Sequence, residues 1–136
     1  MSLKLDHVGH VVKDFNTAMD FYKNKLGLEP DKTMEFSEFG SKMAFYKFAG
    51  TEIELIYPGS GGKGPAAQCL RERGEGIFHM SLRVDDYDAE IKTWKNKGFT
   101  VDEFCNEGGG MRARLAFLRP EETHGLYIEF IKEEKI

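Results

Sequence analysis

The amino-acid sequence predicts an α+β fold in which tandem βαβββ modules form a curved, partly open mixed β-sheet barrel with the helices outside. Three observations support it. The chain repeats itself, since His7 and His79 lie 72 residues apart (79 − 7), as do Asp14 and Asp86. Each copy alternates apolar and polar residues before changing to a helical period. Each copy also ends in a strand-like stretch with a glutamate between large apolar residues. Such duplication indicates one structural unit used twice.

Length and composition favour a single domain. The chain has 136 residues, 40% of them hydrophobic, which suffices for one core. We predict one domain over 1–136, made of a βαβββ module at 4–58, a linker with a short helix at 59–74, and a second module at 75–132.

Charge and cysteine usage exclude several classes of function. The net charge of −4 comes from 19 basic and 23 acidic residues without blocks of either sign, which argues against nucleic-acid and membrane partners. No apolar run approaches the roughly 18 residues of a transmembrane helix. Cys69 and Cys105 are too few for a disulfide framework, so we expect reduced thiols and a cytoplasmic location.

The first module contains one helix and four strands. Asp14 is a suitable N-cap for a helix whose apolar stripe includes Tyr22 and which ends near Gly27. Strands are predicted at 4–12, 30–38, 42–48 and 52–57.

The second half follows the same order after a flexible linker. The linker covers 58–64, and Pro65 begins a short helix that Gly74 stops. The further predictions are strands at 76–84, 99–104, 112–118 and 126–132, a helix at 87–97, a glycine-rich turn at 106–110, and a frayed charged tail at 133–136.

Two glutamates and two histidines are the candidate site. Glu54 and Glu129 are 75 residues apart (129 − 54), three more than the histidines, which fits an insertion near 121–124. By strand parity both point away from their apolar neighbours, which should lie under the helices. His7 and His79 are expected on that same concave face. Two imidazoles and two carboxylates suit one divalent ion of intermediate hardness, with Ni, Co or Zn favoured over Mg. An octahedral ion would keep two positions open.

Other interpretations apply to single residues. A lone strand histidine is more often a core residue, and a lone glutamate is more often solvated; only the joint recurrence favours a metal. His10 is interpreted as a core residue on the helix-facing side. The glycines at 108–110 could cradle a phosphate, but they precede a strand, so a flexible turn is favoured.

The residues resemble a known family. The tandem βαβββ pattern with His7, Glu54, His79 and Glu129 resembles the vicinal oxygen chelate superfamily, and within it the methylmalonyl-CoA epimerase-like proteins. The resemblance is carried by 5–9, Phe21-Tyr22, 26–28, 52–58, 73–79, 83–86, 116–118 and Ile128-Glu129. Two departures concern the stretch 119–125 and Met43, which stands where some members carry an additional catalytic carboxylate.

The resemblance implies a metal-dependent enzyme that moves a proton next to a carbonyl, with Glu129 and Glu54 as the available bases. Epimerisation of a methylmalonyl-type acyl-CoA is the leading expectation. Glyoxalase I-like isomerisation of a thiol adduct (a lactoylglutathione lyase activity) and metal-free ligand binding of the bleomycin-resistance type are the alternatives. A CoA substrate would need cations, for which Lys63, Arg112 and Arg114 are candidates. Members of the superfamily usually pair, so we expect a homodimer.

Overall fold

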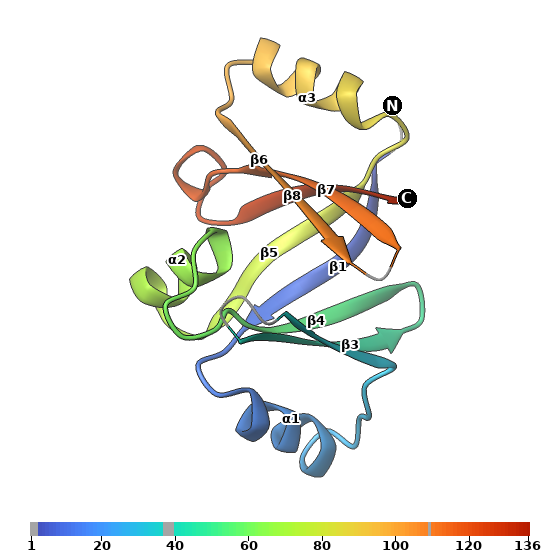
Figure 1. Cartoon of the computed structure of the whole chain (residues 1–136). Coiled ribbons are helices and arrows are strands. Elements are labelled where there is room, and N and C mark those ends of the chain that lie inside the picture. The colour runs from blue at the N-terminus through green and yellow to red at the C-terminus, as the bar shows by residue number, and fades with distance from the viewer. Residues whose placement is uncertain (1–2, 37–39, 109) are drawn as a thin grey trace. The chain divides into compact units, whose positions relative to one another are not determined.

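The structure is a computed structural model that describes residues 3–36, 40–108 and 110–136 (Figure 1). It divides into two compact units. The N-terminal unit is His7–Phe78, and the C-terminal unit joins the described residues of Met1–Asp6 to His79–Ile136. No helix in the described ranges is both long enough and apolar enough to cross a lipid bilayer.

The N-terminal unit carries one βαβββ module followed by a short helix. Its strands follow the order β2-β3-β4-β1, in which β1 and β4 are parallel and the other pairs are antiparallel. The elements are β1 (Lys4–Val11, entering the unit at His7), α1 (Phe15–Asn24), β2 (Lys32–Phe36), β3 (Ser41–Phe48), β4 (Thr51–Tyr57) and α2 (Pro65–Arg73).

Helix α1 covers one face of this sheet and lies beside β3 and β4 (Figure 1). The carboxylate of Asp14 accepts a hydrogen bond from the Thr17 N–H at 3.0 Å, which fixes the start of the helix as predicted. Tyr22 of α1 stacks on Tyr46 of β3 with ring centroids 4.4 Å apart. Leu55 of β4 is buried in the same cluster. The predicted orientation of β4, with its odd-numbered residues under the helix, is therefore confirmed.

The C-terminal unit repeats the module. Its strand order is β5-β8-β7-β6, again with one parallel pair, β5 with β8. The elements are β5 (Gly76–Arg83, entering the unit at His79), α3 (Tyr87–Asn96), β6 (Val101–Gly108), β7 (Met111–Leu118), the 3-10 turn η1 (Pro120–Glu122) and β8 (Tyr127–Lys135). The α+β class and the tandem βαβββ modules are confirmed.

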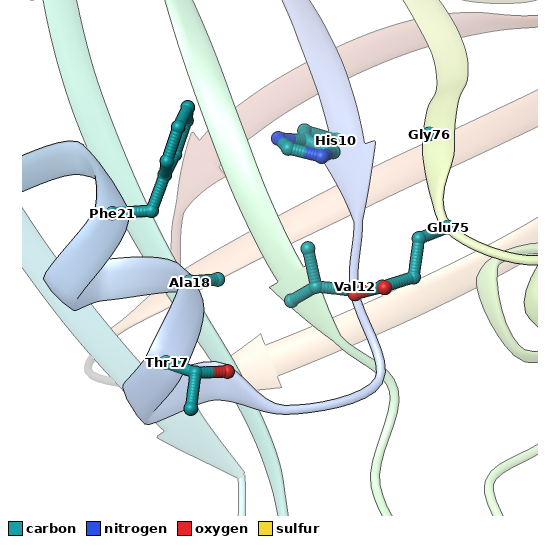
Figure 2. Close-up of a pocket in the computed structure, with 7 residues that line it drawn as sticks. All are labelled: His10, Val12, Thr17, Ala18, Phe21, Glu75 and Gly76. Atoms are coloured by element: carbon teal, nitrogen blue, oxygen red, sulfur yellow. The ribbon is translucent and has the colours of Figure 1, made fainter. Parts of the chain in front are cut away.

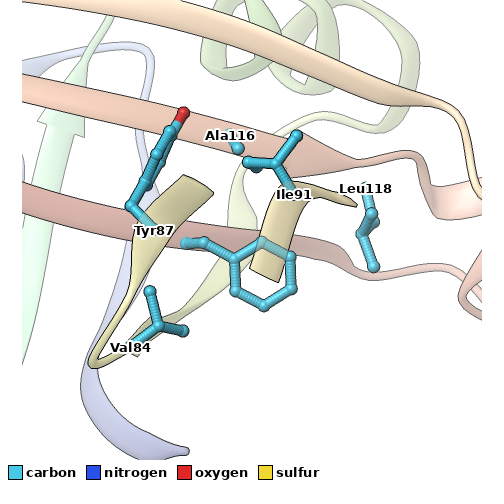
Figure 3. Packing of buried hydrophobic residues seen from close by; sticks show 6 residues of the cluster. Val84, Tyr87, Ile91, Ala116 and Leu118 are labelled. Carbon is cyan, nitrogen blue, oxygen red and sulfur yellow. The ribbon is translucent and has the colours of Figure 1, made fainter. Parts of the chain in front are cut away.

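The core of the C-terminal unit forms between α3 and its sheet (Figure 3). Asp86 caps α3 by accepting from the Ala89 N–H at 3.1 Å, the counterpart of Asp14 in the first copy. Trp94 stacks on Phe130 of β8 at 5.5 Å, and its indole N–H donates to Glu90 at 2.9 Å. That bond satisfies a carboxylate which is otherwise buried.

The three extra residues of the second copy lie in the connection between β7 and β8. Phe45 and Glu54, which pair across β3 and β4, are nine positions apart (54 − 45), whereas Phe117 and Glu129, which pair across β7 and β8, are twelve apart (129 − 117). The connection contains η1 and His124, whose φ of 63° is left-handed. The predicted insertion is confirmed.

Two boundary predictions are wrong. The charged tail at 133–136 continues β8 to Lys135 and pairs with β7 (Ala113↔Glu133, Met111↔Lys135). The glycine-rich turn is shorter than predicted, because β6 runs to Gly108 and pairs it with Met111. Backbone ladder bonds decide both outcomes, and they do not depend on side-chain polarity. The end of the strand predicted at 30–38, and Gly109, lie outside the described residues.

Candidate metal and substrate site

The N-terminal unit brings His7 and Glu54 together. His7 lies on β1 and Glu54 on the parallel neighbour β4, with 3.8 Å between His7 Nε2 and Glu54 Oε1. The histidine is buried, with 4% of its surface exposed. His7 therefore offers a metal-binding nitrogen that lies beside a carboxylate and is shielded from solvent.

The C-terminal unit brings His79 and Glu129 together in the same way. His79 Nε2 lies 3.7 Å from Glu129 Oε1, and both side chains are buried. The rings of Phe117 and His79 are nearly perpendicular, with centroids 6.1 Å apart. Each unit therefore builds one His/Glu pair of nearly the same geometry.

Strand register explains why the pairs match. In the parallel β1–β4 pair Glu54 lies opposite Gly9, two residues after His7. In the parallel β5–β8 pair Glu129 lies opposite Ser81, two residues after His79. Side chains two residues apart on a strand share a face, so histidine and glutamate are diagonal neighbours in both units.

The pairs fit a metal better than they fit hydrogen bonds. Separations of 3.8 and 3.7 Å are longer than a hydrogen bond between nitrogen and oxygen. Two ligand atoms about 2.1 Å from one ion and at right angles lie about 3.0 Å apart, which a small side-chain rotation reaches. An imidazole with a carboxylate is a donor set that suits Zn, Ni or Co.

An aromatic residue flanks each pair, which the sequence reasoning missed. Phe45 of β3 lies opposite Glu54, and Phe117 of β7 lies opposite Glu129. Phe104 of β6 extends the second wall, with its ring 5.9 Å from that of Phe117. Phe45 and Phe117 are 72 residues apart (117 − 45), so the repeat itself contained the signal. Such rings exclude water from the carboxylates.

Two of the predicted cations, Arg112 and Arg114, form ion pairs within the C-terminal unit. Arg112 is paired with Glu107 at 2.8 Å, and Arg114 with Asp88 at 2.7 Å. Both arginines alternate with Phe117 along β7 and share the face of Ala116 and Leu118 under α3, away from Glu129. The assignment of these two arginines and of Lys63 to the phosphates of a CoA substrate stays a prediction.

Lys32 is a cation on the same face of the N-terminal sheet as Glu54. It lies opposite Phe45, which in turn lies opposite Glu54, so the three share one face of the N-terminal sheet. Its Nζ is 4.8 Å from the centre of the Phe45 ring. In the second copy the matching position opposite Phe117 is Asp102, whose carboxylate is held by Arg119 at 2.8 and 2.9 Å.

A cavity of about 270 Å³ lies on the other side of the N-terminal sheet (Figure 2). His10, Phe21 and Glu75 contribute to its lining. His10 Nδ1 is 2.8 Å from the Tyr22 hydroxyl of α1, so the predicted helix-facing orientation is confirmed, although His10 is only half-buried. Burial lowers the pKa of His10 from 6.5, and the charge of Glu75 opposes this in part. None of the four predicted site residues lines this cavity.

Comparison with known proteins identifies the family. Residues 6–131 match the profile of the glyoxalase/bleomycin resistance protein/dioxygenase superfamily, and the chain belongs to it. It is 30% identical to the mitochondrial methylmalonyl-CoA epimerase of Dictyostelium discoideum, over 97% of this chain and 78% of that protein. It is 28% identical to the lactoylglutathione lyase of Haemophilus influenzae, over 90% of this chain and 87% of that protein.

A solved structure is similar to this chain in both fold and sequence. A variant of the Streptomyces coelicolor methylmalonyl-CoA epimerase, in complex with 2-nitronate-propionyl-CoA, superposes with a TM-score of 0.78 at 28% identity. The match covers 96% of this chain and 97% of that chain. The relatives named here are thus methylmalonyl-CoA epimerases and a lactoylglutathione lyase, and one of the epimerases has been solved with an acyl-CoA compound.

Proposed function

We propose that the protein is a divalent-metal-dependent enzyme that transfers a proton next to a carbonyl, with epimerisation of a methylmalonyl-type acyl-CoA thioester as the leading activity. The observation that carries the proposal is the pair of His/Glu sites built in one register, His7 with Glu54 and His79 with Glu129. The epimerases among the relatives support the choice of substrate.

The proposal assigns one ion to both pairs. His7, Glu54, His79 and Glu129 would hold it, with Ni, Co or Zn favoured because two of the ligands are imidazoles. A divalent cation in this place would polarise the carbonyl oxygen of a substrate and make the adjacent C–H more acidic. The fit rests on the donor set and on the burial of both histidines.

The two carboxylates move the proton. One of them, Glu129 or Glu54, takes the proton from the carbon next to the thioester carbonyl, and its own oxygen becomes protonated. If the other carboxyl group begins protonated and gives that proton to the opposite face of the planar carbon, the configuration is inverted and this group is left ionised. The rings of Phe45 and Phe117 keep bulk water from either carboxylate.

Lys32 supports an anionic substrate. A methylmalonyl group carries a carboxylate and CoA carries phosphates, so a cation on the site face is expected. Lys32 lies two strands from Glu54 on that face, above Phe45. We assign it to the anionic part of the substrate.

The glyoxalase I-type reaction is the second candidate. In it the same carboxylate returns the proton to the neighbouring carbon of a thiol adduct. It is favoured by the Haemophilus influenzae relative and by Met43, which lies between Met34 and Ile56 across the sheet. Both cross-strand neighbours of Met43 are apolar, so no catalytic carboxylate occupies the position where some epimerase-like proteins carry one.

Hydrogen exchange separates the two reactions. The Co-loaded protein is incubated with (2R)- or (2S)-methylmalonyl-CoA in deuterated water, and deuterium at C2 is followed by mass spectrometry. We expect exchange in both isomers and its loss in Glu129→Gln, which keeps the size of the side chain and removes the base. Absence of exchange together with turnover of the methylglyoxal–glutathione adduct would reject epimerisation and support the second candidate.

The assembly and location belong to the same proposal. We propose a homodimer in the cytoplasm, for which light scattering should give twice the chain mass of 15.5 kDa. Both cysteines are unbridged, with Cys69 buried and Cys105 exposed, which agrees with a reducing compartment.

A further inference from the structure

Ser81 is a buried residue of β5 whose hydroxyl has no hydrogen-bond partner among the residues that the structure describes. Its side chain is fully buried, with 0% of its surface exposed. A buried hydroxyl without a partner costs free energy, so native proteins rarely keep one without a purpose. Ser81 therefore calls for an explanation that packing alone does not give.

The position of Ser81 indicates its purpose. Ser81 lies directly opposite Glu129 in the parallel β5–β8 register, and it is two residues from His79 on the same face. A serine hydroxyl can donate to a carboxylate, and hydrogen bonds to ionised acceptors are the stronger kind. The carboxylate across the strand pair is thus a suitable acceptor.

The position that matches Ser81 in the first copy of the module cannot donate from a side chain. Gly9 occupies the matching place opposite Glu54, and it has no side chain. The two copies otherwise agree at the histidine, the glutamate and the cross-strand phenylalanine. Glu129 is also the more buried carboxylate, with 6% of its side chain exposed against 14% for Glu54.

We infer that Ser81 is a positioning residue that donates a hydrogen bond to the Glu129 carboxylate in the metal-loaded protein. The inference rests on the proposed function, because it assigns Glu129 to the metal. Partners of metal-binding carboxylates fix their orientation, and loss of such a partner typically weakens metal binding by ten- to a hundredfold. Ser81 thereby gives Glu129 a hydrogen-bond donor at a position where the residue opposite Glu54, Gly9, has no side chain.

The test uses Co²⁺ alone as the probe, with the whole chain. Co²⁺ is titrated into metal-stripped wild type and Ser81→Ala by calorimetry, and the visible spectrum of each loaded protein is recorded. We expect Ser81→Ala to bind Co²⁺ about tenfold more weakly and to shift the visible bands. Its melting temperature without metal should not fall, because the variant removes an unpaired buried hydroxyl.

Tyr46→Phe is the matched control. The Tyr46 hydroxyl is also buried and without a hydrogen-bond partner in the described residues, but it belongs to the cluster under α1. Tyr46→Phe should leave Co²⁺ affinity and the visible spectrum unchanged. An equal loss of affinity in both variants would show a general packing effect and would overturn the inference.

Two further results would also overturn it. If Ser81→Ala binds Co²⁺ as tightly as wild type does, Ser81 does not position Glu129, although the proposed metal site stands. If metal-stripped Ser81→Ala melts well below metal-stripped wild type, the role of Ser81 is structural. A wild-type protein that binds no Co²⁺ would instead reject the proposed function, and the inference with it.

Discussion

Lys32 and Asp102 occupy the same place in two copies of one row of side chains across the sheet. In each row a phenylalanine comes next, then the glutamate of the candidate site, then a small residue. The rows are Lys32–Phe45–Glu54–Gly9 and Asp102–Phe117–Glu129–Ser81. The inner residues agree in type and the outer ones differ. Duplication thus repeats the two inner residues, while the residues at the ends of the rows have diverged.

Replacing Lys32 tests the assignment of the anion. Lys32→Gln should raise KM for an acyl-CoA substrate about tenfold, since a hydrogen bond to a charged group is worth about 1.5 kcal/mol. Little change in kcat is expected, because binding that is equal in ground and transition states affects KM alone. Steady-state kinetics measures both constants.

Lys23→Gln provides the control for Lys32. Lys23 is an exposed lysine on α1 that forms an ion pair with Glu29 at 3.7 Å. Its replacement should leave KM unchanged. Equal KM values for Lys32→Gln and wild type would remove Lys32 from the substrate site.

His10 should make stability depend on pH. Burial holds its pKa below 6.5 in the folded protein, so the unfolded chain binds the proton more readily. The stability that neutral, buried His10 contributes to the folded protein is complete above pH 6.5 and is lost as the pH falls. The free energy of unfolding of wild type should therefore drop between about pH 7 and about pH 5.5, and the slope should be smaller in His10→Gln. Urea titrations at each pH measure it, and identical slopes would contradict the prediction.

The sequence pointed to some residues of the candidate site and not to others, for a physical reason. His7, His79, Glu54 and Glu129 could be predicted because residue type and strand parity recur at a fixed spacing along one chain. Ser81 and Lys32 could not, since their importance depends on which residue lies opposite on another strand. Which residue lies opposite depends on the pairing of strands that are distant along the chain, and a shift of one residue in that pairing changes every neighbour.

At the scale of elements, helices were predicted more accurately than strand ends. Asp14 and Asp86 cap α1 and α3 as expected, because a cap is a local interaction between a side chain and the next turn. The ends of β6 and β8 were misjudged because the ladder with β7 stabilises residues of any polarity. Helix caps can be predicted from a few neighbouring residues, whereas the ends of strands depend on partners elsewhere in the chain.

Removal of residues 133–136 should destabilise the protein. The truncation deletes the part of β8 that pairs with β7 from Ala113 to Met111, and it also removes the 3.0 Å bond from the Ile136 N–H to the Gly110 carbonyl. With a few backbone hydrogen bonds lost at about 1 kcal/mol each, we expect a loss of about 2–3 kcal/mol in a urea titration.

Lys135→Ala is the control for the truncation, because it shortens an exposed side chain and keeps the backbone ladder. It should stay within about 0.5 kcal/mol of wild type. If the truncated chain is as stable as wild type, the last residues of β8 do not contribute to the fold in solution.

For the molecule as a whole, the most informative measurement is the effect of the metal. His7 belongs to the N-terminal unit and His79 to the C-terminal unit, so a single ion held by both would stabilise the two units together. At a metal concentration one hundred times Kd the gain is about 2.7 kcal/mol, or about 5–10 °C in Tm for a chain of this size. Chelation should remove that increment, and calorimetry measures it.

The histidine variants complete this test. Purified wild type should contain about one divalent ion per chain by elemental analysis. His7→Ala and His79→Ala should each lose the ion and the metal-dependent rise in Tm, because each removes one imidazole from a set that needs both. His10→Gln should keep both properties, since His10 faces α1 and bonds to Tyr22. A double variant of His7 and His79 that retains the ion would place the metal elsewhere. Loss in only one single variant would show that one His/Glu pair suffices.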